Sequence, residues 1–341
     1  MNIIRVARWF AIIGQGSGLI FGSKISQELV DASWITQPKG PAMLPRHGRY
    51  DLSMIDERPI YDWPNGKRLA FYVGNNIETF AFGEGLGSDP AFRTEARQTQ
   101  RNHAWRDYGH RVGIWRLLDV LDEFQIPAAH NASSLIYEHC PEIMERVRQR
   151  GDEVIGHGRT QSEHQGSMWA DDEARMIATV TQTIERYEGR PPRGWMGPGM
   201  SNSGVTIDLL QEAGYTFIMD WCADDQPFWM KTRQSRILSV PYPMEVNDSI
   251  AILFRHQGAR EFADMIVDQF DEMIEQCVER PLVCAVATHP MTVGQPFRLK
   301  LVREALAHIA HHPRRDLVWF AHPGAIAEHV AALPAGIVPG S

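Results

Sequence analysis

Short apolar runs alternate with longer amphipathic stretches from about residue 66 to residue 332. The runs are typical of buried β-strands, and the stretches are typical of helices that pack one face against a sheet. Pro141 and Gly151 mark the predicted start and end of one helix, and Pro127 ends an earlier one. The predicted strands lie at 68–73, 128–131, 154–155, 216–220, 237–240, 250–254, 282–287 and 317–320.

Strands that alternate with amphipathic helices build parallel β/α units. Seven or eight such units in one run favour a closed or nearly closed barrel over an open nucleotide-binding sheet. The sequence contains neither G-x-G-x-x-G nor G-x-x-x-x-G-K-[ST], which counts against dinucleotide or nucleotide chemistry. We therefore predict an α/β fold in which residues 67–341 form a (β/α) barrel.

Residues 1–66 show no sustained periodicity, and five prolines interrupt their second half. This pattern predicts an extended arm laid over the barrel or over a neighbouring subunit, so a homo-oligomer is expected. Residues 9–21 are apolar, but polar residues and glycines interrupt them and no A-x-A cleavage site follows. We expect a cytoplasmic protein, with an export signal in residues 1–23 as the alternative.

The composition narrows the class of partner. A net charge of −8 argues against a nucleic-acid binder, which would present a basic surface. No stretch approaches the roughly 18 to 20 apolar residues of a membrane span. The four cysteines lack any C-x-x-C spacing, which favours small buried residues over a disulfide frame or zinc knuckle. A small-molecule substrate is therefore expected.

Polar residues follow several predicted strands, where the mouth of a parallel barrel carries its chemistry. Each residue alone has a structural explanation, such as a turn cap or a solvated carboxylate. Jointly they predict a site with a general base, an acid and room for a metal. The candidates at these strand ends are Asn76, Glu78, His157, Asp224 and His289. Trp195 and Trp221 suggest a flat, partly apolar pocket for a small ring, although packing explains each of them equally well.

Four stretches carry a resemblance to a known family: Val73-Gly-Asn-Asn-Ile-Glu78, Arg106-Asp-Tyr-Gly-His-Arg-Val-Gly-Ile-Trp115, Asp152-Glu-Val-Ile-Gly-His-Gly158 and Thr288-His-Pro-Met-Thr-Val-Gly-Gln-Pro296. Their order and spacing resemble the polysaccharide deacetylase superfamily (NodB homology, carbohydrate esterase family 4). Within it, the chain is most similar to the allantoinase-like PuuE branch and the cyclic-imide hydrolases. The resemblance implies a distorted, seven-stranded (β/α) barrel that hydrolyses a non-peptide C–N bond.

The resemblance also implies roles for individual residues. In metal-using members, an acidic residue and two histidines hold a divalent metal, a neighbouring aspartate is the base, and a late histidine assists the departing group. Glu78, His157 and His289 match the acidic ligand, the first histidine and the late histidine. Asn76 stands in place of the aspartate and Gln161 in place of the second histidine.

These departures leave the cofactor open. His164 lies three residues after Gln161, so Glu78, His157 and His164 are the candidate ligands of one divalent metal, with zinc the first choice. The allantoinase-like branch is thought to work without metal, in which case Glu78 or His157 activates water directly. Asp224 is expected to orient a histidine or hold a substrate N–H. Asn76, Trp195, Trp221 and Arg298 are the predicted substrate-binding residues.

Three functions remain open at this stage. A ureide or cyclic imide hydrolase is the first choice because of the branch resemblance. A polysaccharide or amino-sugar de-N-acetylase is the second. A catalytically inactive, ligand-binding barrel is the third, because the departures at Asn76 and Gln161 also fit a lost activity.

Overall fold

Strand β1 (Leu69–Ile77) is buried along its whole length and pairs with three other strands. Its first half lies beside β9 (Val318–Phe320), its second half lies beside β2 (Ala128–Ala132), and β8 (Leu282–Thr288) runs along its other edge.

The computed structural model describes residues 46–82 and 99–341. Residues 1–23, for which an export signal was the alternative, and most of the predicted arm lie outside the described residues.

In this part of the chain, nine strands form one sheet in the order β6-β7-β5-β4-β3-β2-β1-β8, with β9 paired to β1. The remaining strands are β3 (Glu153–Gly156), β4 (Gly194–Trp195), β5 (Phe217–Ile218), β6 (Phe228–Lys231) and β7 (Arg236–Ser239). Seven parallel strands run from β7 to β8, and β6 adds an antiparallel edge. The predicted distorted (β/α) barrel is confirmed.

Two isolated backbone hydrogen bonds link β8 to the segments that flank β6 and β7 at the other end of the sheet. The Val283 N–H donates to the Asp225 carbonyl over 2.9 Å, and the Ala287 N–H donates to the Val246 carbonyl over 3.0 Å. The sheet is therefore curved far enough for these connecting segments to reach β8, although no continuous ladder joins its two ends.

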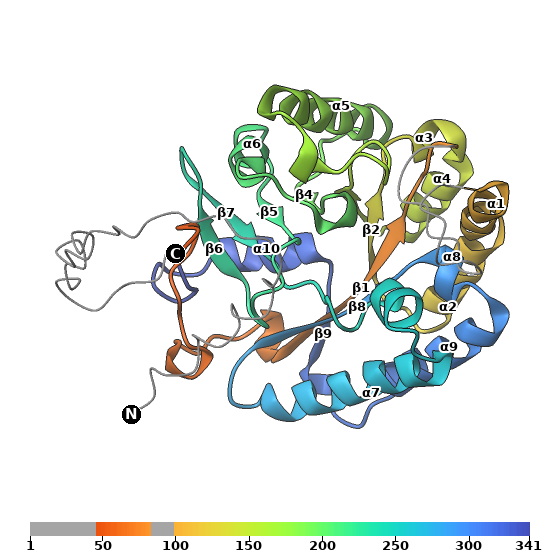
Figure 1. Ribbon diagram of the computed structural model, residues 1–341. Coiled ribbons are helices and arrows are strands. Elements are labelled where there is room, and N and C mark those ends of the chain that lie inside the picture. Colours follow the sequence, from red (N-terminus) through yellow and green to blue (C-terminus); the bar gives the residue numbers. More distant parts are fainter. Residues whose placement is uncertain (1–45, 83–98) are drawn as a thin grey trace, which may run out of the picture. The chain divides into compact units, whose positions relative to one another are not determined.

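Helices surround the strands in Figure 1. They are α1 (Gln100–Tyr108), α2 (Ile114–Glu123), α3 (Ile136–His139), α4 (Pro141–Arg150), α5 (Ala170–Glu188), α6 (Thr206–Glu212), α7 (Ala259–Gln276), α8 (Pro290–Val293), α9 (Pro296–Ala310) and α10 (Pro323–Ala331). The predicted boundaries of α4 are confirmed, with Pro141 in its first turn and left-handed Gly151 ending it at φ 71°. None of the helices in the described ranges is long and apolar enough to cross a membrane.

The strands separate two apolar clusters. Leu69, Phe71 and Val73 of β1 face the helices in one cluster, whereas Ala70 and Tyr72 face the inside of the curved sheet in the other. Helix α10 contributes Ile326 and Val330 to the inner cluster, and Tyr61 and Trp63 join it from the segment before β1. The inner face of the barrel is therefore filled by side chains.

The predicted strand at 250–254 is wrong. Residues Ser249–Phe254 form a π-helical turn instead. The side chain of Asn247 accepts the backbone N–H groups of Ser249 and Ile250 at 3.0 and 3.4 Å, which favours a helical start over a ladder.

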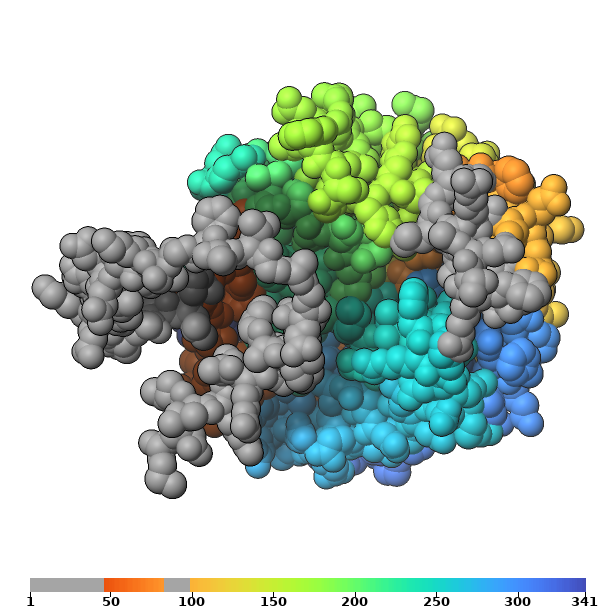
Figure 2. Space-filling model, viewed as in Figure 1, coloured from red at the N-terminus to blue at the C-terminus, as the bar shows by residue number. Residues whose placement is uncertain are grey.

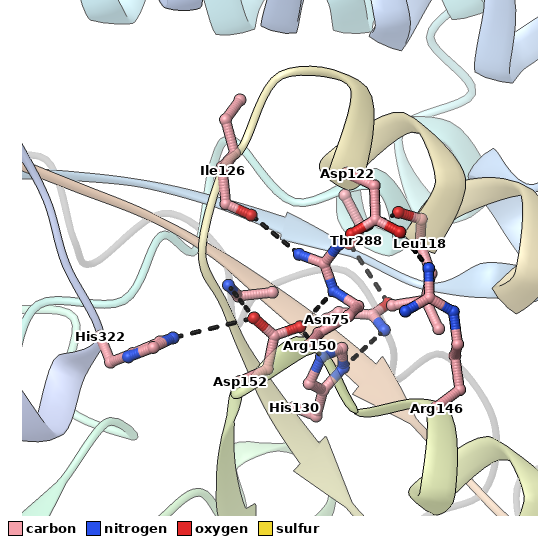
Figure 3. A network of polar contacts seen from close by, with 11 residues as sticks. Asn75, Leu118, Asp122, Ile126, His130, Arg146, Arg150, Asp152, Thr288 and His322 are labelled. Carbon is pink, nitrogen blue, oxygen red and sulfur yellow. Dashed lines mark hydrogen bonds and ion pairs between the residues drawn. The ribbon is translucent and has the colours of Figure 1, made fainter. Parts of the chain in front are cut away.

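A buried polar network ties β1, β2 and β3 together below the mouth of the barrel (Figure 3). The Asn75 amide lies 3.0 Å from Nδ1 of His130, and Nε2 of His130 lies 2.9 Å from Asp152. Arg150 donates from Nε to the same carboxylate over 2.6 Å. Burial alone would raise the pKa of Asp152, but His130, His322 and Arg150 outweigh it and hold that pKa well below its usual range.

The segment before β1 is held to the barrel by charge and by an indole. Arg49 makes a two-bond contact with Asp208, at 2.7 Å for each bond, and Arg58 makes a similar one with Asp224. Trp63 is buried and donates to the Leu282 carbonyl over 3.1 Å. Residues 47–66 therefore belong to the same compact unit as the strands.

Candidate active site

Glu78 follows the last residue of β1 and is the centre of the candidate site. Its side chain is 6 % exposed, and Oε1 lies 3.6 Å from Nε2 of His157 and 3.4 Å from Nε2 of His289. The two histidines follow β3 and β8, so three strands deliver these side chains to one place. The structure thus brings together three of the predicted catalytic residues, because the carboxyl ends of parallel strands share one edge.

His157 is fixed by the loop that follows β3. Gly158 after it adopts φ 65°, a left-handed conformation that favours glycine. Nδ1 of His157 lies 2.7 Å from the Met196 carbonyl, which can only accept, so Nδ1 carries the proton and donates it. Nε2 is buried without a hydrogen-bond partner among the described residues, and it faces Glu78.

His289 is held from behind by Asp248. Its Nδ1 donates to one carboxylate oxygen of Asp248 over 2.6 Å, and its backbone N–H donates to the other over 2.9 Å. Asp248 is fully buried. The two bonds orient the imidazole so that Nε2 points to Glu78.

The charges of these groups reinforce one another. Burial alone would raise the pKa of Glu78, but His289 and His157 outweigh burial and hold that pKa well below its usual range. Burial alone would lower the pKa of His289, but Asp248 and Glu78 raise it to about 10. The site at neutral pH therefore contains an ionised carboxylate next to a protonated imidazole.

A small cavity opens onto this pair. Its lining includes Asn76, Glu78, Arg106, His110, His289 and Met291. Arg106 is almost buried over the Phe80 ring, 3.6 Å from its centroid, and burial lowers the pKa of Arg106 to about 10 against the opposing effect of Glu78. The face shown in Figure 2 is hollowed between the green segments after β3 and β4 and the cyan segment near residue 250.

The loop after β3 presents further polar atoms. Besides His157 Nε2, the atoms Gln161 Oε1, Ser162 Oγ and His164 Nε2 are buried and lack a hydrogen-bond partner within the described ranges. Buried polar atoms are normally hydrogen-bonded, so four such atoms in one short loop point to a polar ligand or to water. Gln161 is held close to β1, because its N–H donates to the Thr79 carbonyl over 2.9 Å.

Asp224 does not join the site. Both of its oxygens bind Arg58, at 2.7 and 2.6 Å, and its neighbour Asp225 lies beside Val283 near the start of β8. Val283 is level with Ala70 on β1, eight positions before Glu78. The stagger of the barrel strands thus places Asp224 far from the residues that follow β1, and the catalytic role predicted for it is wrong.

The predicted substrate-binding residues are scattered. Trp195 is fully buried and donates to Gln165 over 2.9 Å, so it packs inside the fold and cannot touch a substrate. Trp221 donates to Asn202 over 3.0 Å and contacts the rings of His47 and Tyr50. Both tryptophans are therefore accounted for by packing.

Asn76 and Arg298 lie closer to the predicted chemistry. The Asn76 amide donates to the Tyr242 hydroxyl and the Thr288 carbonyl at 2.9 and 3.1 Å, and its oxygen accepts from Asn131. Asn76 lines the cavity, but these bonds make it chiefly a cross-link between strand ends. Arg298 donates to the Thr292 carbonyl over 3.2 Å and lies near the charge of Asp248.

The predicted three-ligand metal centre is not assembled. Glu78 and His157 face each other, but the His164 ring lies against Gly199. In the described residues one group of three histidine or acidic side chains brings its ligand atoms within 4.8 Å of one another, and it contains none of Glu78, His157 and His164. Because a catalytic zinc ordinarily has three protein ligands, the trio Glu78, His157 and His164 does not fit that cofactor in this arrangement.

Two carboxylates beside the site escaped prediction as site residues. Asp248 lies two residues before the predicted strand at 250–254, at its start and not at its end, so no pattern marked it. Asp220 follows β5, and it accepts the Gly197 N–H over 2.8 Å and the Asn202 amide over 3.1 Å. Burial raises the pKa of Asp220 to about 6, against these bonds and the influence of His157. Its position after a strand was the available signal.

Comparison with known proteins bears on the family and the fold. Residues 106–218 match the family model described as polysaccharide deacetylase. Over these residues the chain is similar to the polysaccharide deacetylases. The predicted resemblance to that family is confirmed, and its deacetylases hydrolyse the C–N bond of amides.

Two curated relatives carry deacetylase names. A Schizosaccharomyces pombe protein named "Putative polysaccharide deacetylase" is 24% identical over 280 residues, which cover 77% of this chain and 85% of that protein. A Helicobacter pylori peptidoglycan deacetylase is 22% identical over 237 residues, covering 60% of this chain and 80% of its own.

Solved structures share the fold. PuuE allantoinase superposes with a TM-score of 0.70 at 23% identity, over 79% of this chain and 92% of that one. A probable polysaccharide deacetylase from Pseudomonas aeruginosa PAO1 superposes with a TM-score of 0.67 at 22% identity, over 78% of this chain and 92% of that one. At this identity the likeness establishes the barrel, and the substrate has to be argued from the site.

Proposed function

We propose that the protein hydrolyses a non-peptide C–N bond of a small cyclic ureide or imide. The observation that carries this proposal is the Glu78 carboxylate held between two imidazoles, His157 at 3.6 Å and His289 at 3.4 Å. The arrangement offers a base, an acid and a place for water beside one small cavity. These are the elements that hydrolysis of an amide-like bond requires.

In the proposed reaction, water is held between Glu78 Oε1 and His157 Nε2. Both atoms accept hydrogen bonds, since Nδ1 of His157 already donates to Met196. A water molecule can therefore donate one proton to each of them. Glu78 takes a proton as the water oxygen bonds to the substrate carbonyl carbon.

His289 completes the reaction. The imidazolium gives its Nε2 proton to the substrate nitrogen as the C–N bond breaks, and it then regains a proton from Glu78, which took one from the water and lies 3.4 Å from Nε2. Asp248 keeps the ring charged and oriented before the transfer. Arg106 lines the same cavity and its charge acts on Glu78, and in the proposed reaction it stabilises the oxyanion that forms on the carbonyl oxygen.

Two observations favour a cyclic ureide or imide. The neighbour named PuuE allantoinase shares the fold. The buried unpartnered atoms of Gln161 and Ser162 can meet the N–H and C=O groups of such a ring. The homo-oligomer and the cytoplasmic location expected from the sequence remain part of this proposal.

A de-N-acetylase acting on amino sugars is the second candidate. It is favoured by the family matched at residues 106–218 and by the names of the two curated relatives. The same three side chains would serve it, because an acetamide also presents a carbonyl and a leaving nitrogen.

The product distinguishes the two. Purified full-length protein is incubated with allantoin and succinimide in one series, and with oligomers of N-acetylglucosamine in the other. We expect the rings of allantoin and succinimide to open. Mass spectrometry should show that the mass of each compound increases by one water and that no fragment is released. Release of acetate without ring opening would replace the first candidate by the second. No turnover of either series by a folded protein that still binds these compounds would favour the inactive barrel.

A further inference from the structure

Outside the barrel mouth, one cluster of side chains has the arrangement of a metal site. Asp271 on α7 and His308 and His312 at the end of α9 bring their ligand atoms within 4.8 Å of one another. The two helices lie side by side in Figure 1 and pack along their length. No residue of this cluster belongs to the candidate active site.

The geometry fits a transition-metal ion. Asp271 Oδ1 lies 2.7 Å from Nε2 of His308 and 3.7 Å from Nε2 of His312. Zinc bound at about 2.0–2.2 Å by such ligands in a tetrahedral site would hold their donor atoms roughly 3.4 Å apart, between the two observed separations. Small side-chain rotations therefore suffice to admit an ion.

The histidines are held in this arrangement. His308 lies in the last turn of α9 and His312 lies two residues beyond the end of that helix, and their ring centroids are 5.5 Å apart. The edge of His312 packs against Phe270 with centroids at 5.4 Å. Arg314, the cation that follows in sequence, is neutralised by Glu275 over 2.6 Å. The cluster is partly exposed, so a hydrated ion can reach it.

We propose that Asp271, His308 and His312 form a structural site for a divalent transition metal that joins α7 to α9. Two imidazoles and one carboxylate favour zinc, cobalt, nickel or copper over magnesium or calcium, which prefer more oxygen ligands. Metal binding would break one hydrogen bond. Nδ1 of His312 now accepts the Arg314 N–H over 3.2 Å, and a metal on Nε2 puts a proton on Nδ1 that breaks this bond.

Zinc chloride titrated into the EDTA-stripped full-length protein by calorimetry tests the site. We expect one ion per chain, with the dissociation constant raised at least tenfold in His308→Ala and in Asp271→Asn. His311→Ala is the matched control, because His311 is exposed beside the site and its Nδ1 contacts the Ala307 carbonyl of its own helix. The zinc affinity of His311→Ala should equal that of the wild type.

Thermal melting provides the second measurement. Zinc should raise the melting temperature of wild type and His311→Ala, because an ion that binds only the native state stabilises it by mass action. It should not do so for His308→Ala. Equal melting of all three proteins in EDTA shows that the variants fold. Zinc binding that is unchanged in both His308→Ala and Asp271→Asn, or absent from the wild type, would overturn the proposal.

Discussion

At the scale of single residues, Glu78 depends on the two imidazoles beside it. Replacing Glu78 by Gln keeps the shape and removes the base. We expect kcat to fall by roughly 10²- to 10⁴-fold, the usual contribution of a general base. Steady-state assays of Glu78→Gln beside Glu212→Gln, a surface carboxylate paired with Arg233, test this. Equal activity of wild type and Glu78→Gln, with matching circular dichroism, would exclude Glu78 as the base.

The pKa of His289 predicts the alkaline limb of the pH profile. Because that pKa is raised to about 10, the acid stays protonated through neutral pH and is lost as the pH rises through about 10. Asp248→Asn removes the charge that does most to raise it, so the alkaline limb of kcat/KM should move to lower pH. A profile from pH 6 to pH 11 measures the shift. An unmoved limb would show that Asp248 does not set the protonation of His289.

At the scale of elements, the register of β1 with β2 and β3 depends on the buried network around Asp152. The depressed pKa of Asp152 stabilises the fold above its unfolded value near 3.9, and this contribution is lost as the pH falls below it. Asp152→Asn leaves His130 and Arg150 without their ionised partner, which typically costs about 3 kcal/mol.

Urea unfolding at pH 7 and pH 2 measures this effect. The free energy of unfolding of Asp152→Asn should be lower than that of wild type at pH 7, and the two should approach each other at acid pH. Asp172→Asn removes an exposed partner of Arg175 and should change stability by less than about 0.5 kcal/mol. If Asp152→Asn behaved like this control, the network would not be what holds the three strands.

At the scale of the whole molecule, the segment before β1 is part of the barrel's packing. A chain that starts at residue 67 lacks Arg58 and Trp63, so Asp224 loses its partner and the inner apolar cluster loses an indole. It should melt at a lower temperature than a chain that starts at residue 47. Calorimetric scans of the two truncated proteins test this, and equal melting temperatures would contradict it.

Much of the barrel and of the site could be predicted from the sequence. Polar residues in the segments that follow apolar strands indicated Glu78, His157 and His289, because in a parallel barrel such residues share one edge. No knowledge of side-chain packing was needed for that step. The same reasoning misplaced Asp224, because sequence order does not reveal the stagger that carries the loop after β5 toward the start of β8.

The sequence by itself determined the alternation of strands and helices and the three side chains at the strand ends, since periodicity and chain order are local properties. Only the tertiary structure decided which groups contact these side chains and which other predicted residues join the site. Asp248 meets His289 from a distant π-helical turn, His164 turns to Gly199, and Trp195 faces the interior. Charge partners and burial depend on contacts between segments far apart in the chain, and these arise only when the sheet curves and its loops converge.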